Sequence, residues 1–446
     1  MRPSRFGLAA SIAACVLAAC AGATRARSPG PSAAADDACC TALGRRIAQR
    51  HRVAALSTRR FTHEQLWAAL DPIVRRPSFR VADVGRSIQG RPLRAVTYGT
   101  GPTTVLLWSQ MHGDESTATM ALADLMAWLG DGASDGAEVR ARLASALTIV
   151  MVPMLNPDGA QLFQRENAVG VDVNRDAASL ATPEARALKA LRDSIRPQFG
   201  FNLHDQGARI LVGRGGRQVG IALLAPAADE GRGYGGARAA ARLVASGLVT
   251  VVEREIPGRV AKYEDDFNPR AFGDLMQRWG TSTVLIESGA LPADPEKQQL
   301  RAVNVVAVLS ALDAIASGRY RAADPAVYDA LPMNARTAVD VLVRGGRVVL
   351  PGVEPLRVDL ALNYDEPLAR LRPRVREVGD LSTVVAFDTV DAAGLFLHPA
   401  TGTLTAEGEA RWLRLGAPAT FALRRGAAPG SPLVRTIGDP VPPGAR

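Results

Sequence analysis

Residues 104–116 read TVLLWSQMHGDES, and this stretch decides how the rest of the chain is interpreted. Its apolar part, Thr104 to Trp108, is typical of a buried strand, and residues 118–129 beyond it are typical of a helix. His112 and Glu115 therefore stand three residues apart in a strand-to-helix loop, where a parallel α/β sheet presents its functional groups. At this spacing an imidazole and a carboxylate face the same way and together suit a zinc ion.

A catalytic zinc site normally has three protein ligands and an open position for water. The third ligand is expected at the end of another strand, and the apolar run 199–203 ends in His204. The chain has only 5 histidines, and two of them fall where such a site needs them. The sequence therefore predicts one Zn²⁺ per chain, held by His112, Glu115 and His204, although the His112–Glu115 pair alone would be a common coincidence.

Length and composition favour a folded globular protein. The chain has 446 residues, enough for one large domain and a smaller one, with 47% hydrophobic and 22% charged residues. Its net charge of +9 comes mainly from arginine. The arginines are scattered and no aromatic residues interleave with them, so we expect no nucleic-acid partner.

The first forty residues have the pattern of an export segment. Residues 1–20 combine a charged start, a short apolar stretch and small residues, as a signal peptide does. Residues 17–20, LAAC, resemble a bacterial lipobox, which implies cleavage before Cys20 and lipid attachment to its sulfur. We therefore expect a periplasmic or cell-envelope lipoprotein, with residues 21–40 as a flexible tether. The alternative is an ordinary signal peptide and a secreted soluble protein.

Besides Cys15 and Cys20 in the export segment, the chain has Cys39 and Cys40, which are adjacent. A disulfide between neighbouring residues is strained, so no structural bridge is expected from them. Free thiols or an intermolecular link remain open for this pair.

From residue 79 onward, apolar runs alternate with helical patterns. The strand candidates are residues 79–84, 93–98, 105–108, 147–152, 200–203, 220–224 and 284–286, and the helix candidates are residues 118–129, 183–195, 236–248 and 298–315. Helices between continuous apolar strands imply parallel crossovers, and the pair 79–84 and 93–98 is typical of an edge hairpin. We predict an α/β domain over residues 41–320, with a mixed, mostly parallel sheet flanked by helices.

The pattern changes after residue 324. Residues 339–349, 357–362, 375–378 and 395–397 are short and β-rich, with expected turns at Gly345-Gly346 and at residues 363–365. These features predict a small all-β C-terminal domain over residues 325–425. Residues 426–446 are rich in proline and glycine and are predicted to be a disordered tail.

Two further motifs lie between the candidate metal ligands, PMLNPDG at residues 153–159 and GVDVNRD at residues 170–176. With the HxxE motif before them and a strand-end histidine after them, the ordered set resembles the zinc carboxypeptidases of the M14 (carboxypeptidase A-like) family. The resemblance covers about residues 79–316 and implies that family's fold. It also predicts a glutamate at the end of a late strand, where TVLI at residues 283–286 is followed by Glu287.

The resemblance implies roles for the remaining site residues. Glu287 is expected to be the general base for the attacking water, and Arg165 is expected to stabilise the oxyanion. Asn174 and Arg175 match the pair that binds the terminal carboxylate of the substrate, a task that suits a guanidinium. Asp172 matches the carboxylate that orients the first histidine ligand through its other nitrogen.

One part of the family pattern is less regular. The substrate-contacting tyrosine is expected about twenty residues before Glu287, and the tyrosine nearby, Tyr263, stands slightly early. Asn268, Arg270 and Asp274 are alternative pocket residues. Substrate specificity is therefore left open by the sequence.

The sequence predicts a zinc-dependent hydrolase that cleaves a C-terminal amide bond of a peptide with a free carboxylate, a metallocarboxypeptidase. The alternatives on the same fold are a cell-wall peptide amidase and an acyl-amino-acid deacylase. A different class is a non-catalytic peptide-binding envelope lipoprotein, although a pure binder has no need of a buried general base. A structural lipoprotein with incidental motifs is the remaining alternative.

Overall fold

The structure, a computed structural model, describes residues 31–132, 135–336, 338–407 and 410–438. Its larger part is built on an eight-stranded sheet in the order β1-β2-β4-β3-β5-β9-β7-β8. The strands are β1 (Phe79–Arg86), β2 (Pro92–Tyr98), β3 (Thr103–Ser109), β4 (Leu147–Val152), β5 (Phe199–Asp205), β7 (Ile221–Leu224), β8 (Val260–Lys262) and β9 (Ser282–Ser288). The predicted mixed α/β fold is therefore confirmed.

The centre of the sheet is parallel. β4, β3, β5 and β9 run in the same direction, whereas β7 runs antiparallel to β9 and the β1–β2 hairpin closes the other edge antiparallel, as expected. Because parallel strands end at the same edge, the carboxyl ends of β3, β5 and β9 meet there. This edge positions the candidate site.

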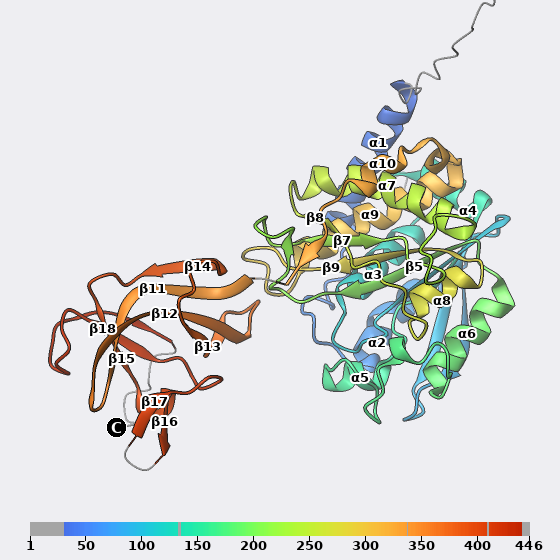
Figure 1. Ribbon diagram of the computed structural model, residues 1–446. Coiled ribbons are helices and arrows are strands. Elements are labelled where there is room, and N and C mark those ends of the chain that lie inside the picture. The colour runs from blue at the N-terminus through green and yellow to red at the C-terminus, as the bar shows by residue number, and fades with distance from the viewer. Residues whose placement is uncertain (1–30, 133–134, 337, 408–409, 439–446) are drawn as a thin grey trace, which may run out of the picture.

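Helices cover both faces of the sheet (Figure 1). Val105 and Leu107 of β3 pack toward the helices α1 (Pro31–Arg50), α2 (His63–Val74), α3 (Thr117–Leu129), α7 (Ala237–Glu255) and α9 (Gln298–Ser317). Leu106 and Trp108 pack on the opposite face, toward α6 (Pro183–Ile195) and α8 (Phe272–Arg278). Residues of β3 that point to either side are thus buried, which explains the continuous apolar run of this strand.

The N-terminal part of the chain differs from the prediction. The expected signal peptide with Cys20, and residues 21–30 of the expected tether, lie outside the described residues. Residues 31–40 are not tether, because α1 already begins at Pro31. Gly44 lets α1 approach α9 closely, since a Cβ there would lie 2.9 Å from the Cα of Val306. Cys40 is buried with a free thiol.

The helix α9 is a core element. Among the described residues it is the one helix long and apolar enough to cross a membrane, but 78% of that stretch is buried inside the protein. Its buried Arg301 donates to the equally buried Asp124 of α3, with 2.7 Å between Nε and Oδ2. The ion pair joins α9 to α3 on the same face of the sheet.

A second sheet follows the α/β domain, and residues 338–438 are called the β domain below. Its strands run in the order β13-β12-β11-β15-β18-β19, with β14 also paired to β11. They are β11 (Ala338–Leu350), β12 (Val353–Glu366), β13 (Leu371–Gly379), β14 (Val385–Asp391), β15 (Phe396–Pro399), β18 (Phe421–Arg424) and β19 (Leu433–Ile437). In Figure 1 the β domain lies beside the α/β domain.

Three predictions about this region are wrong. Residues 325–329 form a short helix, α10 (Pro325–Asp329), whose Tyr328 is buried in the α/β core, so the β domain begins later than residue 325. Gly345-Gly346 and residues 363–365 are not turns: the first is an irregularity within β11 and the second lies inside β12. Residues 433–437, expected in a disordered tail, form β19 because they pair with β18.

Candidate metal centre and active site

The loop that carries His112 is held by close backbone packing. β3 ends at Ser109, and Gln110 takes a left-handed conformation with φ of 51° and donates from Nε2 to the Gly113 carbonyl at 2.9 Å. A Cβ on Gly113 would lie 2.0 Å from the carbonyl carbon of Gly159, so only glycine fits. The NPDG motif that contains Gly159 therefore packs directly against the loop of His112.

Asp158, the aspartate of the NPDG motif, also has a structural role. Asp158 is buried and accepts from the Ser87 hydroxyl at 2.8 Å, the Gln89 amide at 2.9 Å and Arg91 Nη1 at 2.7 Å. These donors lie at the turn between β1 and β2. The motif thus ties the edge hairpin to the loop of His112.

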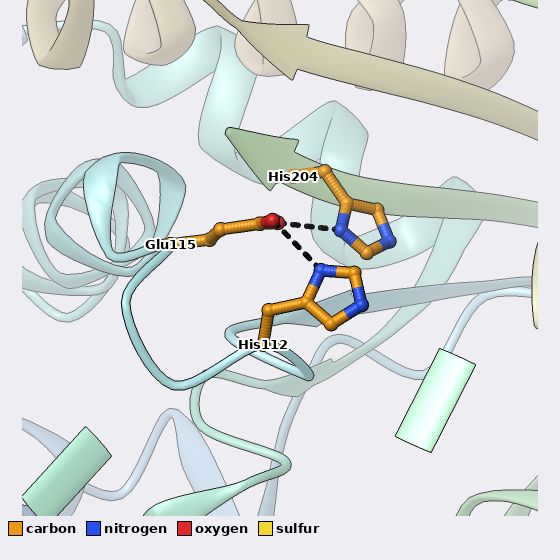
Figure 2. A group of neighbouring side chains, drawn as sticks. All are labelled: His112, Glu115 and His204. Atoms are coloured by element: carbon orange, nitrogen blue, oxygen red, sulfur yellow. Dashed lines mark hydrogen bonds and ion pairs between the residues drawn. The ribbon is translucent and has the colours of Figure 1, made fainter. Parts of the chain in front are cut away.

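The three predicted metal ligands come together (Figure 2). His112 Nδ1 lies 2.7 Å from one carboxylate oxygen of Glu115, and His204 Nδ1 lies 2.6 Å from the other. All three side chains are buried, and their ligand atoms lie within 4.8 Å of one another. Two imidazoles and one carboxylate, contributed by the loop after β3 and the end of β5, match the donor set of a catalytic zinc.

The outer contacts of this cluster also suit a metal centre. His112 Nε2 lies 3.0 Å from Asp172 Oδ1, so the nitrogen that faces away from Glu115 has a carboxylate partner. Such a partner fixes the ring orientation and the tautomer of a metal-bound histidine. The donor chemistry of the cluster therefore fits a Zn²⁺ ion, and the structure places Asp172 where the sequence predicted it.

Charge is concentrated at this site. Burial lowers the pKa of His112, but the Glu115 and Asp172 carboxylates outweigh burial and raise it to about 9. Burial alone would raise the pKa of Glu115, but His112 and His204 hold it well below its ordinary value. The carboxylate of Glu115 is thus ionised, as a ligand of a divalent cation must be.

Glu287 lies next to the cluster because of the strand register. β5 and β9 pair in parallel with His204 opposite Glu287, so the third ligand and the predicted general base occupy neighbouring positions. Glu287 is buried, and burial followed by the nearby Glu115 raises its pKa well above the ordinary value. A glutamate with a raised pKa beside a candidate metal site can accept and return a proton.

Arg165 reaches the cluster from the loop after α5 (Pro157–Leu162). Its Nε and Nη2 donate to Asp172 Oδ2 at 3.0 and 2.8 Å, which fixes the guanidinium plane. Its Nη1 lies 3.1 Å from His112 Nδ1 and 3.4 Å from Glu115 Oε1. Arg165 is therefore held at the edge of the His112–Glu115–His204 cluster.

Asn174 and Arg175 are placed differently from each other. Asn174 Oδ1 accepts from the Phe272 amide at 2.9 Å, and its Nδ2 lies 3.4 Å from His204 Nε2, so its amide joins a metal ligand to α8. Arg175 Nη1 donates to the Asn174 carbonyl at 3.0 Å, and both residues line the cavity in front of the site.

One large cavity opens onto the cluster, with a volume of about 1220 Å³. Tyr263, Asn268 and Asp274 line it. The charge of Glu287, followed by burial, raises the pKa of Tyr263 to about 12, which keeps its hydroxyl protonated. Its role in binding substrate stays a prediction.

The sequence reasoning missed a buried cation beside the site. Lys297 is 3% exposed and has φ of 51°, and its Nζ lies 3.1 Å from Asp205 Oδ2 and 3.0 Å from the Ser288 carbonyl. Asp205 follows His204 and Ser288 follows Glu287, so one ammonium group ties together the ends of both strands. A buried lysine in the loop before α9 carries no sequence signal of this kind, but the polar residues at the last positions of the two strands, Asp205 and Ser288, are a hint.

Comparison with known proteins agrees with the site. The sequence model of the zinc carboxypeptidase family (Peptidase_M14) matches residues 68–211. Carboxypeptidase 2 of Trichophyton tonsurans is 33% identical over 101 residues, which is 22% of this chain and 18% of that protein. Carboxypeptidase E of Caenorhabditis elegans is 30% identical over 117 residues, which is 22% of this chain and 25% of that protein.

Among solved structures, a metallo-carboxypeptidase from Burkholderia cenocepacia aligns with a TM-score of 0.45 and 20% identity, over 57% of this chain and 69% of that one. The chain thus spans only about a fifth to a quarter of the length of the two curated relatives. The matched segment 68–211 contains His112, Glu115, Arg165 and Asp172. Over residues 68–211 the chain is therefore similar to the zinc carboxypeptidase (M14) family.

We predict that the purified chain binds one zinc ion and that His204→Ala weakens zinc binding by more than ~100-fold, since even outer partners of a ligand contribute ~10–100-fold. The measurement is zinc content after dialysis against graded concentrations of a competing chelator. The matched control is His398→Ala, because His398 lies in the β domain, 3.0 Å from the Gly426 carbonyl. Equal zinc retention by both variants would remove His204 from the ligand set.

Proposed function

We propose that this protein is a zinc-dependent metallocarboxypeptidase that hydrolyses the C-terminal amide bond of a peptide. The observation that carries the proposal is the register of β5 and β9, which sets His204 opposite the buried Glu287, a residue that lines the cavity. A His-Glu-His cluster with an adjacent carboxyl of raised pKa supports metal-assisted hydrolysis rather than passive binding.

The chemistry follows from the positions of the side chains. Zinc bound by the cluster would polarise the scissile carbonyl and activate water. Glu287 accepts the proton of the attacking water and returns it to the leaving amine. Arg165, held in plane by Asp172, donates to the developing oxyanion, and Arg175 binds the free carboxylate of the substrate. Tyr263 faces the same cavity as a hydrogen-bond donor.

Glu287→Gln is expected to lower kcat by ~10²–10⁴-fold, the usual contribution of a general base, while zinc content stays at the wild-type level. The assay is release of C-terminal residues from a mixed peptide library. Glu264→Gln is the matched control, because Glu264 lines the same cavity but is exposed. Comparable activity in both variants would exclude Glu287 as the base.

The same assay separates the alternatives on this fold. Wild-type protein that holds zinc but releases no residue from any peptide would favour an amidase on cell-wall peptides or an acyl-amino-acid deacylase. Protein that takes up no zinc in excess metal would favour the peptide-binding lipoprotein.

The cavity lining supports a preference for basic C-terminal side chains. Asp274 is 9% exposed and lines the cavity together with Arg175, and its Oδ1 accepts from the Asn268 amide at 2.9 Å. The nearby Asn202 has a buried Oδ1 without a hydrogen-bond partner. A Cβ on Gly273 would lie 3.2 Å from Asn202 Nδ2, so these residues are neighbours. Two acceptors in one pocket complement an ammonium or guanidinium group.

We therefore predict that Asp274→Asn lowers the ratio of kcat/KM for C-terminal Lys over C-terminal Leu peptides by at least ~30-fold, the effect of removing one partner of a buried charge pair. Asp266→Asn, at an exposed position of the same cavity, should leave the ratio unchanged. An unchanged ratio in Asp274→Asn would refute the preference.

The pH dependence provides a second test of the same pocket. Burial raises the pKa of Asp274 to about 6. Above this pH the carboxylate is charged and attracts a cationic side chain, and below it the group is neutral. The Lys-to-Leu ratio should therefore fall as pH decreases through about 6 in the wild type and stay flat in Asp274→Asn.

We also propose that the protein is exported and anchored by a lipid on Cys20. The support is the sequence alone: a charged start, an apolar stretch and LAAC at residues 17–20. Radiolabelled fatty acid should be incorporated into the wild type expressed in a bacterial host and not into Cys20→Ala. Equal incorporation would refute the anchor, and a labelled protein that is released into the medium would refute membrane attachment.

A further inference from the structure

The cavity in front of the metal site has walls from both domains. Most of its lining comes from the α/β domain, but Asp365, Glu366, Pro367, Leu368 and Ala369 also line it. These five residues form the tip of the hairpin between β12 and β13. The cavity volume of about 1220 Å³ exceeds the ~300–1,000 Å³ typical of small-molecule sites. It therefore has room for several residues of a peptide.

A single arginine fixes this hairpin to the α/β domain. Arg209 donates from Nε and Nη2 to Asp340 Oδ2 of β11 at 2.8 and 2.7 Å, and Nη2 also contacts the Tyr364 carbonyl of β12. Asp340 is 6% exposed and accepts from the Tyr364 amide at 2.7 Å. Because Tyr364 directly precedes the cavity-lining residues, Arg209 sets the position of the hairpin tip.

The segment that carries Arg209 begins at the metal site. It follows His204 directly, and the Gln206 amide donates to the Ser288 carbonyl at 2.9 Å, next to Glu287. Within it, β6 (Leu211–Val212) pairs with β10 (Asn334–Ala335), the strand that precedes the β domain. The β domain is thus attached to the α/β domain through the continuation of the strand that holds the third ligand.

The hairpin tip is braced by ion pairs and contributes two uncharged residues, Pro367 and Leu368, to the cavity lining. Glu366 pairs with Arg372 at 2.7 Å and Asp365 pairs with Arg374 at 2.8 Å, so both carboxylates are engaged within their own hairpin. Pro367 and Leu368 between the strands are half-buried and carry no charge. Their surface suits the side chains of an extended peptide rather than a charged group.

We propose that the β12–β13 hairpin tip is a peptide-binding subsite, in which Leu368 and Pro367 contact substrate residues on the N-terminal side of the cleaved bond. The inference rests on the proposed carboxypeptidase function. The β domain then makes the enzyme favour peptides of several residues over dipeptides. The occupant is an extended peptide, whose backbone passes between the two domains toward the metal cluster.

The test compares two substrates with the same C-terminal residue, a blocked dipeptide and a blocked hexapeptide with apolar residues upstream. Leu368→Asp should lower the ratio of kcat/KM for the hexapeptide over the dipeptide by roughly tenfold, because it places a charge against apolar side chains. Leu356→Asp is the matched control, since Leu356 lies in β12, the strand that leads to the hairpin tip, and is 60% exposed and outside the cavity lining. It should leave the ratio unchanged.

A second variant tests whether Arg209 positions the hairpin tip. Arg209→Met removes the donor to Asp340 and Tyr364 and should lower the same ratio, whereas zinc content stays at the wild-type level. An unchanged ratio in Leu368→Asp, or the same loss in Leu356→Asp, would overturn the subsite. An equal loss on both substrates would overturn it too, since the hairpin would then act on the chemistry or on stability.

A binding measurement tests the subsite without depending on catalysis. A fluorescently labelled form of the hexapeptide is titrated into zinc-loaded Glu287→Gln protein with and without Leu368→Asp. Weaker hexapeptide binding in the double variant, with unchanged dipeptide binding, would support the subsite even if no variant hydrolysed peptides. Equal hexapeptide affinity would overturn it, whereas absence of hydrolysis by the wild type would count only against the proposed function.

Discussion

The structure around the site depends on the buried carboxylate of Glu115. Its two oxygens lie 2.7 and 2.6 Å from the imidazoles of His112 and His204, and one also accepts from the Asp205 amide at 3.1 Å. A buried carboxylate is costly unless it is paired and fully hydrogen-bonded. The loop after β3 and the end of β5 must therefore meet within hydrogen-bond distance. A cation bound between these three side chains would also compensate the buried charge of Glu115.

The supporting contacts show how the fold maintains that meeting point. The backbone contact of Gly113 with Gly159 fixes the loop from behind. Lys297 links Asp205 to the Ser288 carbonyl, and thus the strand of His204 to the strand of Glu287. Buried charges of this kind contribute little net stability, so their use here is better explained by positioning. The NPDG motif belongs to the same support, although it carries no chemistry itself.

The β domain supplies a second wall of the cavity, which the α/β domain lacks by itself. The segment that follows His204 carries Arg209, and Arg209 donates to Asp340 of the β domain. These contacts, and not only a linker, position the hairpin tip relative to the candidate metal ligands. Domains joined by small polar interfaces usually move relative to one another. Here a buried carboxylate and a strand pair at the junction oppose such motion, and the cavity can keep two walls.

The sequence determined the parts of this protein that depend on local spacing. The strand-loop-helix around His112, the strand-end positions of His204 and Glu287, and most strands and helices of the α/β domain follow from periodicity and apolar runs. The sequence failed where long-range pairing decides the outcome. Residues 433–437 became a strand because β18 offers a partner, and Gly345-Gly346 became an irregularity within β11 rather than a turn. Only the tertiary structure set His204 beside Glu287 and turned Asn174 toward α8. It also buried Lys297 between two strand ends and brought the tip of a separate domain into the cavity. Side-chain periodicity encodes which face of an element is buried, but the register and packing of distant elements decide which buried faces meet.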